Sequence, residues 1–223
     1  HLMKSLTLII PAKFEGESLP LVLKEIEDIK CPKIIVLDNN DHETINFINE
    51  IPGIEILHQK KSGYGAALIE GVENCKTDFF CIFNADGSFN PAELPKMYNQ
   101  LETYDFIFAS RYQENSGSDD DNIITSIGNF FFTKIGNIFF KLPITDILYT
   151  FVMGKTKMAK SLDLSKQDFS YCVELPIKAY KNKMKIVSSS SFERKRIAGK
   201  KKVNAIKDGF LILKNMIHLY FSK

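Results

Sequence analysis

Two oxygen-bearing side chains, Asn84 and Asp86, follow the apolar segment DFFCIF at an interval of two positions in the sequence FNADGS. In an extended chain successive side chains alternate between faces, so residues two apart point the same way. An amide and a carboxylate directed to one side could coordinate a hard divalent cation. Asn, Asp and Gly also favour turns for reasons that have no connection with catalysis. These six residues alone leave both interpretations open, a turn and a metal site.

Polar residues also follow three other apolar segments that read as strands. They occupy residues 11–15 after LTLII, residues 38–41 after KIIVL, and residues 110–111 after YDFIFA. Ligands of open parallel sheets bind outside the carboxyl ends of the strands. The four segments together therefore predict one pocket that is lined by acids, amides and an arginine.

The elements that carry these residues alternate between strand and helix patterns. Apolar runs of strand length occur at residues 6–12, 33–39, 54–59, 78–86 and 104–111. Helical spacing of apolar residues occurs at residues 17–29, 43–51, 63–75 and 90–101. This alternation predicts an α/β fold with a mostly parallel, doubly wound sheet and helices on both faces. Because no repeat or low-complexity linker interrupts the chain, we expect a single domain at residues 4–223.

Two apolar segments of the second half each allow two interpretations. Residues 122–142 form a Phe-rich helix candidate whose aromatic positions cover more than one narrow stripe, and residues 205–221 are again apolar and basic. Such helices can pack against the sheet, or they can rest on the surface of a bilayer. Neither segment approaches the roughly 20 apolar residues of a membrane span.

Composition excludes several classes of protein. The net charge of +2 gives no global field for nucleic acid, and four cysteines without a CxxC pair indicate neither a zinc site nor a disulfide framework. Six Lys and Arg residues are concentrated in ERKRIAGKKK, residues 193–202, without the interleaved aromatics that stack on bases. We expect a cytoplasmic protein that does not bind nucleic acid and that can lie peripherally on the inner face of the membrane.

Seven segments in order resemble the motifs of the family-2 inverting glycosyltransferases of GT-A fold: IIPAKFEGESLP, IIVLDNND, KSGYGAAL, FNADGSFNPAEL, ASRY, ITD and RIAGKKK. Within that family the pattern is similar to the dolichyl-phosphate mannose synthase-like branch. Each short motif is weakly specific by itself, but the series extends from about residue 6 to residue 209. The resemblance implies transfer of a sugar, with inversion, from a UDP- or GDP-sugar to a polyprenyl phosphate at the cytoplasmic membrane face.

The resemblance also implies a donor half at residues 4–111. A Mg²⁺ or Mn²⁺ ion is expected on the donor diphosphate, bound by Asp86 and by Asn84, which stands where the family usually has a second Asp. A hard cation there would stabilise the departing diphosphate. The residues expected to bind the donor are Pro11, Ala12, Glu15, Asp38, Asn39, Lys61, Gly65, Asn84 and Ala85.

An acceptor half is implied at residues 112–223. Together with Asp86, the residues expected to be catalytic are Arg111, Asp146, Arg196 and Lys202. A hydroxyl acceptor would need Asp146 as a general base, whereas a phosphate acceptor needs cations such as Arg196 and Lys202. Two alternatives therefore stay open beside the lipid phosphate: a sugar or glycan acceptor, and a degenerate nucleotide-sugar-binding protein with little turnover.

Overall fold

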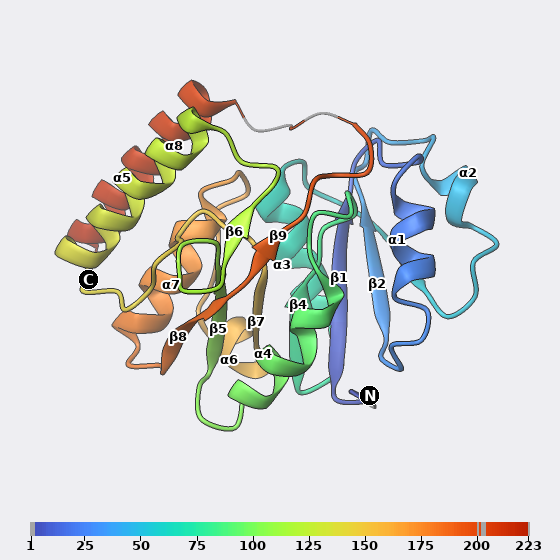
Figure 1. Ribbon diagram of the computed structural model, residues 1–223, viewed down its shortest axis with the longest axis horizontal. Helices are drawn as coiled ribbons and strands as arrows, with labels where there is room; N and C mark the ends of the chain where they lie inside the picture. Colours follow the sequence, from blue (N-terminus) through green and yellow to red (C-terminus); the bar gives the residue numbers. More distant parts are fainter. Residues whose placement is uncertain (1–2, 200, 202–203, 223) are drawn as a thin grey trace.

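The computed structural model describes residues 3–199, 201 and 204–222. Its centre is a seven-stranded sheet in the order β3-β2-β1-β4-β7-β5-β8, and a two-stranded ribbon, β6-β9, continues from the end of β8 (Figure 1). The strands are β1 (Leu6–Ala12), β2 (Lys33–Leu37), β3 (Glu55–His58), β4 (Phe79–Ile82), β5 (Phe106–Ser110), β6 (Gly117–Ser118), β7 (Val152–Lys155), β8 (Ile186–Ser190) and β9 (Phe192–Glu193). In the seven-stranded sheet β7 pairs antiparallel with both of its neighbours, and the other pairs are parallel.

Helices cover both faces of this sheet, so the predicted fold class is confirmed (Figure 1). The helices are α1 (Leu19–Glu25), α2 (Ile45–Ile48), α3 (Tyr64–Asn74), the 3₁₀ turn η1 (Pro91–Glu93), α4 (Leu94–Gln100), α5 (Ile123–Phe139), α6 (Thr156–Ser161), α7 (Tyr171–Lys181) and α8 (Ala205–Phe221). One apolar core lies between the sheet and α1, α2 and α4. The other contains residues of α3, α5, α6, α7 and α8. Strands buried on both faces explain the continuous apolar runs in the sequence.

The parallel pairing brings polar strand ends to one edge of the sheet. The carboxyl ends of β1, β2 and β4 lie there because parallel neighbours end on the same side. The strand β5 ends there too, because β4 and β5 are both antiparallel to β7, which lies between them. The antiparallel strand β7 starts at this edge, so the segment that precedes it returns to the same place. In this way Asp146 reaches the end of β5, where Arg111 lies.

Two predicted strands are too long at their carboxyl ends. The strand expected at residues 33–39 ends at Leu37, and the one expected at 78–86 ends at Ile82. Asn84 and Asp86 therefore lie in the loop beyond β4, where strict alternation of side chains no longer applies. Turn-forming Asn and Asp residues follow both strands, which end early for that reason.

The two Phe-rich or basic helices lie side by side on the outside of the fold (Figure 1). Each buries one side only: Phe132 of α5 and Ile212 and Met216 of α8 belong to the core. The ring of Tyr220 contacts Phe139 and Phe140 edge-on, which joins the ends of the helices. The packing expected from the sequence is therefore observed for one side of each helix, and the other side is apolar and exposed.

Candidate active site

Asp86 lies in a turn that holds one oxygen of its carboxylate and exposes the other to a cation. Its Oδ1 accepts hydrogen bonds from the backbone N–H of Ser88 at 3.0 Å and from the Ser88 hydroxyl at 2.6 Å. Its Oδ2 lies 3.4 Å from Nη2 of Arg196. The turn needs glycine at position 87, where φ is +81° and a Cβ would lie 2.5 Å from the Ile197 side chain. The segment is therefore a turn that positions a carboxylate.

The basic segment after β9 is fastened to this turn by backbone hydrogen bonds. The N–H of Arg194 donates to the Ser88 carbonyl, and the N–H of Ile197 donates to the Asp86 carbonyl, both at 2.8 Å. The Arg194 guanidinium donates to the carbonyl of Phe89 at 2.8 Å and pairs with Glu25. These contacts fix the segment over the end of β4 and direct Arg196 to Asp86.

A second carboxylate, Asp120, shares the Arg196 cation. Its Oδ2 lies 3.4 Å from Nη2 of Arg196 and 3.3 Å from Nζ of Lys201. Arg196 thus bridges two carboxylates, Asp86 and Asp120, that are 34 residues apart in the sequence. Sequence reasoning missed Asp120, because an acidic run such as SDDD does not show which of its members turns inward. Lys202, which was expected to be catalytic, lies outside the described residues.

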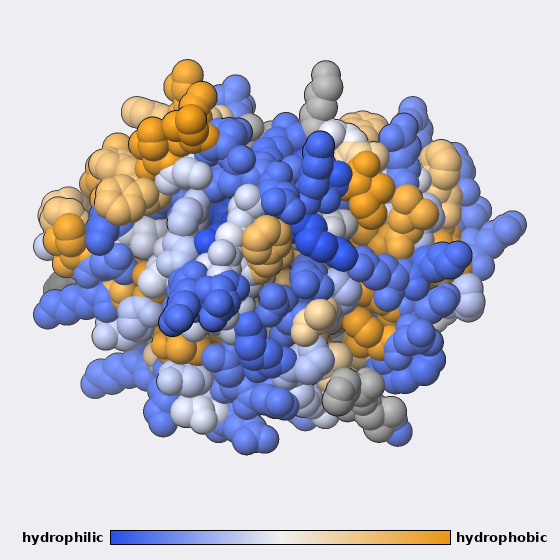
Figure 2. Space-filling model, viewed as in Figure 1, coloured by the Kyte–Doolittle hydropathy of each residue, from blue (hydrophilic) through white to orange (hydrophobic). Residues whose placement is uncertain are grey.

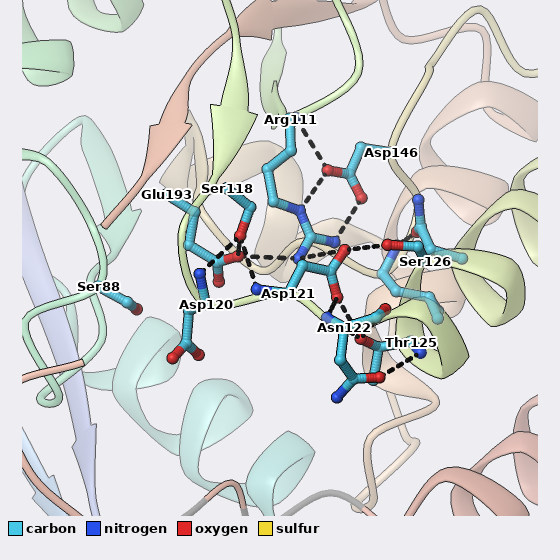
Figure 3. A network of polar contacts seen from close by, with 12 residues as sticks. Ser88, Arg111, Ser118, Asp120, Asp121, Asn122, Thr125, Ser126, Asp146 and Glu193 are labelled. Atoms are coloured by element: carbon cyan, nitrogen blue, oxygen red, sulfur yellow. Dashed lines mark hydrogen bonds and ion pairs between the residues drawn. The ribbon is translucent and has the colours of Figure 1, made fainter. Parts of the chain in front are cut away.

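Arg111 is the centre of a buried polar network that positions Asp120 (Figure 3). Asp146 accepts from it three times: from Nε at 2.8 Å, from Nη2 at 3.0 Å and from the backbone N–H at 3.0 Å. Nη1 lies 3.1 Å from Glu193 and 3.8 Å from Asp121. The hydroxyl of Ser118 donates to Glu193 and accepts from the N–H groups of Asp120 and Asp121. Arg111 therefore orders the segment that carries Asp120.

Asp146 is held by Arg111 and faces no solvent. Its exposed fraction is 1%, and both of its oxygens accept hydrogen bonds from Arg111. Burial raises the pKa of the Asp146 carboxyl, although the hydrogen bonds and charge of Arg111 oppose that rise. An acceptor hydroxyl would have to enter the buried pair to deliver a proton. The geometry suits a positioning role for Asp146 better than that of a general base.

Asp121 makes the stability of this network depend on pH. Burial would raise the pKa of its carboxyl, but hydrogen bonds from Thr125 and Tyr112 and the charge of Arg111 outweigh it and lower the pKa to about 2. Since the unfolded value is 3.8, the ionised carboxylate stabilises the fold above pH 4. That contribution is lost as the pH falls from about 4 to about 2.

We expect Asp121→Asn to be less stable than the wild type by about 2 kcal/mol at pH 7 and by about 1 kcal/mol at pH 3. Urea unfolding of both proteins at the two pH values measures the difference. An unchanged difference at pH 3 would show that the carboxylate does not titrate below its ordinary range.

Asn84 contacts α3. Its Oδ1 accepts a hydrogen bond from the Tyr64 hydroxyl at 3.3 Å. Burial raises the pKa of the Tyr64 phenol, and the negative charge of nearby Asp86 raises it further, so Tyr64 stays neutral. Tyr64 therefore contacts Asn84 and experiences the charge of Asp86, although sequence reasoning did not assign it to the site. Ala85, which lies between Asn84 and Asp86 in the sequence, is buried.

The expected donor-binding residues of β1 and β2 lie beside each other. Asp38 pairs with Lys13 at 3.2 Å, and its N–H donates to the carbonyl of Ala12. Asn39 is exposed, and its Oδ1 accepts from the Ser62 hydroxyl at 3.2 Å, which links β2 to the loop before α3. Pro11 and Ala12 are the last two residues of β1. The structure thus gathers the acids and amides that follow these strands.

Gly65 and Lys61 are explained by contacts within the chain itself. A Cβ on Gly65 would lie 2.1 Å from the carbonyl oxygen of Lys166, so glycine allows α3 to approach that segment closely. Lys61 is exposed, and its N–H donates to Glu70 at 2.9 Å. The requirement for glycine at position 65 is accounted for by packing, without a bound donor.

A hollow lies between the loop after β1, the start of α2 and the tip of the basic segment. Glu15 lines it together with the exposed ring of Phe14, the ring of Phe47 and Gly199. Phe14 has a φ of +53°, and its N–H donates to Asp41 at 2.6 Å. A side chain in the left-handed region that is fixed in this way often marks a functional loop.

The carboxylates of Asp86 and Asp120 fit a divalent cation that also binds a substrate. Mg²⁺ commonly takes one or two carboxylates from the protein and its remaining oxygens from phosphates and water. Among the described residues no group of three or more His, Cys, Asp or Glu side chains could hold a metal ion. Asp86 Oδ2 already faces a cation, the Arg196 guanidinium. These residues suit a metal ion that arrives with a diphosphate.

A mostly parallel α/β sheet with acids and a basic segment at the carboxyl ends of its strands is typical of GT-A glycosyltransferases. The family profile described as glycosyl transferase family 2 matches residues 7–163. The chain belongs to this family, and it is therefore an enzyme, a glycosyltransferase that uses a nucleotide-sugar donor.

Relatives and solved structures agree with this assignment. An uncharacterized glycosyltransferase of Mycobacterium tuberculosis is 26% identical over 210 residues, which cover 93% of this chain and 94% of the relative. The undecaprenyl-phosphate mannosyltransferase of Micrococcus luteus is 33% identical over 119 residues, 49% of each chain. The glucosyl-3-phosphoglycerate synthase of M. tuberculosis, solved with Mn²⁺, UDP and phosphoglyceric acid, has a TM-score of 0.76 at 12% identity and covers 99% of this chain and 80% of that one. This last likeness confirms the GT-A fold.

Proposed function

We propose that the chain is a metal-dependent inverting glycosyltransferase that moves a sugar from a UDP- or GDP-sugar to a polyprenyl phosphate at the cytoplasmic face of a membrane. On this proposal the chain would belong to the dolichyl-phosphate mannose synthase-like branch of the family. Residues 4–111 would bind the donor, and residues 112–223 the acceptor. The observation that carries the acceptor assignment is the burial of Asp146 against Arg111, beside the cations Arg196 and Lys201.

The donor would lie along the carboxyl ends of β1, β2 and β4. Glu15 and Asp38 would contact the nucleoside, near the hollow beside Phe14. Asp86, with Asp120 or Asn84, would hold a Mg²⁺ or Mn²⁺ ion, which stabilises the negative charge that develops on the departing diphosphate. The structures of M. tuberculosis glucosyl-3-phosphoglycerate synthase with UDP and Mn²⁺ or Mg²⁺ support this choice of ions.

A lipid phosphate acceptor matches the charges on the other side of the site. A phosphate already carries a nucleophilic oxyanion and needs cations to bind it, whereas a hydroxyl needs a base. Arg196 and Lys201 supply positive charge, and Asp146 is engaged with Arg111. The relative that is named an undecaprenyl-phosphate mannosyltransferase supports the same class of acceptor, although the match covers only 49% of this chain.

Transfer of radiolabelled sugar from UDP- or GDP-sugars to a polyprenyl phosphate, with and without Mn²⁺, tests the proposal directly. A thermal-shift panel of UDP-, GDP- and dTDP-sugars identifies the donor first, because a ligand at 100 times its Kd stabilises a protein by about 2.7 kcal/mol. We expect the shift to grow when Mn²⁺ is present. Tight donor binding without metal dependence and without transfer to any acceptor would instead indicate a nucleotide-sugar-binding protein.

Asp146→Asn separates the two acceptor classes. With a phosphate acceptor, we expect stability to fall by about 2 to 4 kcal/mol, because Arg111 loses a buried partner, while kcat falls less than about tenfold. With a hydroxyl acceptor and Asp146 as base, kcat would fall by about 10² to 10⁴. Thermal melting and transfer rates per folded molecule measure both effects.

Asp105→Asn is the matched control for that experiment. Asp105 lies at the opposite end of β5 and pairs with Lys155 at 2.8 Å, away from the site. It should lose stability without any loss of kcat. A large, selective loss of kcat in Asp146→Asn would favour a sugar or glycan hydroxyl as the acceptor.

A further inference from the structure

The outer sides of α5 and α8 carry most of the exposed apolar surface of the described chain. Twelve of its nineteen large exposed apolar side chains lie on these two helices. Figure 2 shows apolar side chains gathered over the part of the molecule where Figure 1 places α5 and α8. An apolar patch concentrated in this way on a folded protein marks an interaction surface.

The apolar residues recur at helical spacing along both helices. Ile127, Phe130 and Ile138 form an exposed stripe on α5, and Ile206, Phe210 and Ile217 form one on α8. We call the surface made by these six residues the α5–α8 face. The helices run in parallel: Gly209 near the start of α8 lies against Phe132, and Tyr220 near its end contacts Phe139. Two parallel stripes on neighbouring helices make one broad apolar surface.

The charges of these helices suit an anionic surface. Lys134, Lys207 and Lys214 are exposed, and α5 contains no acidic residue. Asp208, the acid of α8, accepts from the N–H of Asn204 at the start of the helix. Long lysine side chains can lie along apolar surface and extend their ammonium groups to lipid phosphates. Two copies of this face against each other would instead bring like charges together.

The α5–α8 face begins where the candidate site ends. Asn122 caps the start of α5 directly after Asp120 and Asp121, and Asn204 caps the start of α8 shortly after Lys201. The segments that lead into the two helices contact each other through Asp120 and Lys201. A lipid with its phosphate at the site would therefore have apolar helix surface beside it for its hydrocarbon chain.

We propose that the α5–α8 face binds the surface of an anionic lipid bilayer, with the two helices lying in the plane of the interface. Amphipathic helices of this composition insert their apolar side into the boundary between headgroups and acyl chains. No helix in the described part of the chain is long and apolar enough to cross a membrane. This inference rests on the proposed function for its biological purpose, because the bilayer would present the polyprenyl phosphate, but vesicle binding tests it independently.

Flotation with vesicles of phosphatidylcholine and 30% phosphatidylglycerol measures the binding. We expect the wild-type chain to float with these vesicles, and Phe130→Glu and Phe210→Glu each to bind at least about tenfold more weakly. Lys214→Glu should weaken binding to the anionic vesicles about fivefold and leave binding to pure phosphatidylcholine unchanged. Because the substituted side chains are exposed, the melting temperatures of the three variants should match that of the wild type.

Leu21→Glu is the matched control, because Leu21 is 53% exposed on α1, which belongs to the other core. It should bind vesicles as the wild type does. A wild-type chain that stays unbound would overturn the proposal, and so would equal binding by all variants. Dimers in light scattering that Phe210→Glu dissociates, without vesicle binding, would identify a second copy as the partner instead.

Transfer assays separate this inference from the proposed function. Phe210→Glu should lose transfer to a long-chain polyprenyl phosphate in vesicles but keep transfer to a short-chain, water-soluble prenyl phosphate. If the wild type binds vesicles but transfers sugar to neither acceptor, the proposed function is refuted and membrane binding by the α5–α8 face is supported. If it transfers sugar to both acceptors but does not bind vesicles, membrane binding by this face is refuted and the proposed function is supported.

Discussion

Asp86→Asn is expected to lower the rate of sugar transfer by about 100- to 1000-fold. The substitution keeps the size of the side chain and can keep the hydrogen bonds from Ser88 to Oδ1. It removes the charge from the oxygen that faces Arg196, which is also the oxygen available to a divalent cation. The departing diphosphate would then lose the ion that stabilises its charge. Transfer rates over a range of Mn²⁺ concentrations, together with Mn²⁺ binding by electron paramagnetic resonance, measure both effects.

Two further variants isolate the role of that charge. Asp78→Asn removes an exposed carboxylate just before β4, at the opposite end of the same strand, and should transfer sugar at the wild-type rate. Asn84→Asp adds a carboxylate and should strengthen Mn²⁺ binding about tenfold, because the charge of the ligands tunes the affinity. Wild-type transfer by Asp86→Asn, or an equal loss in Asp78→Asn, would remove Asp86 from the site.

The first half of the fold could be predicted because its elements are locally encoded. Runs such as LTLII and KIIVL are buried on both faces of a parallel sheet, and helical spacing separates them. The predicted boundaries were wrong where Asp38 and Asn84 follow a strand, since polar residues at a strand end can continue it or turn. Alternation therefore identified the elements better than it identified where they end.

In the second half the helix candidates at residues 122–142 and 205–221 were found as α5 and α8, but the strands were not predictable. The strand β7 has only the residues VMGK, and it enters the sheet antiparallel between β4 and β5. These four residues do not indicate that β4 and β5 are the partners of the strand. The glycine at position 154 is explained only by the structure, where a Cβ would lie 2.3 Å from the ring of Phe106. Long-range pairing decides such a strand, and local propensity does not.

The candidate site, too, was predicted only in part from the sequence. Asp86, Arg111, Asp146 and Arg196 were singled out by short motifs, and the structure joins them in two pairs, Asp86 with Arg196 and Arg111 with Asp146. Glu193 was not singled out, because its part in the network depends on Arg111, 82 residues away in the sequence. Motifs locate chemical groups, but contacts that link distant segments decide which groups face a ligand and which hold the others in place.

Arg196→Ala is expected to reduce transfer by about 100-fold or more and, at the same time, to strengthen Mn²⁺ binding in the absence of donor. The loss of transfer follows because a guanidinium that binds phosphate contributes strong, charge-assisted hydrogen bonds. The gain in metal affinity follows because Arg196 lies 3.4 Å from both Asp86 and Asp120 and competes with a metal ion for their charge. A metal ion bound with the donor would release Arg196 from the carboxylates and leave it free to pair with a phosphate.

Opposite signs for metal binding and transfer distinguish this role from a general loss of structure. Lys195→Ala removes the neighbouring cation, which is exposed, and should change neither quantity by more than about twofold. Arg196→Lys keeps the charge without the planar fork and should recover only part of the transfer. If Arg196→Ala weakened Mn²⁺ binding, Arg196 would support the metal site and not compete with it. A wild-type rate of transfer by Arg196→Ala would show that Arg196 binds neither the diphosphate of the donor nor the phosphate of the acceptor.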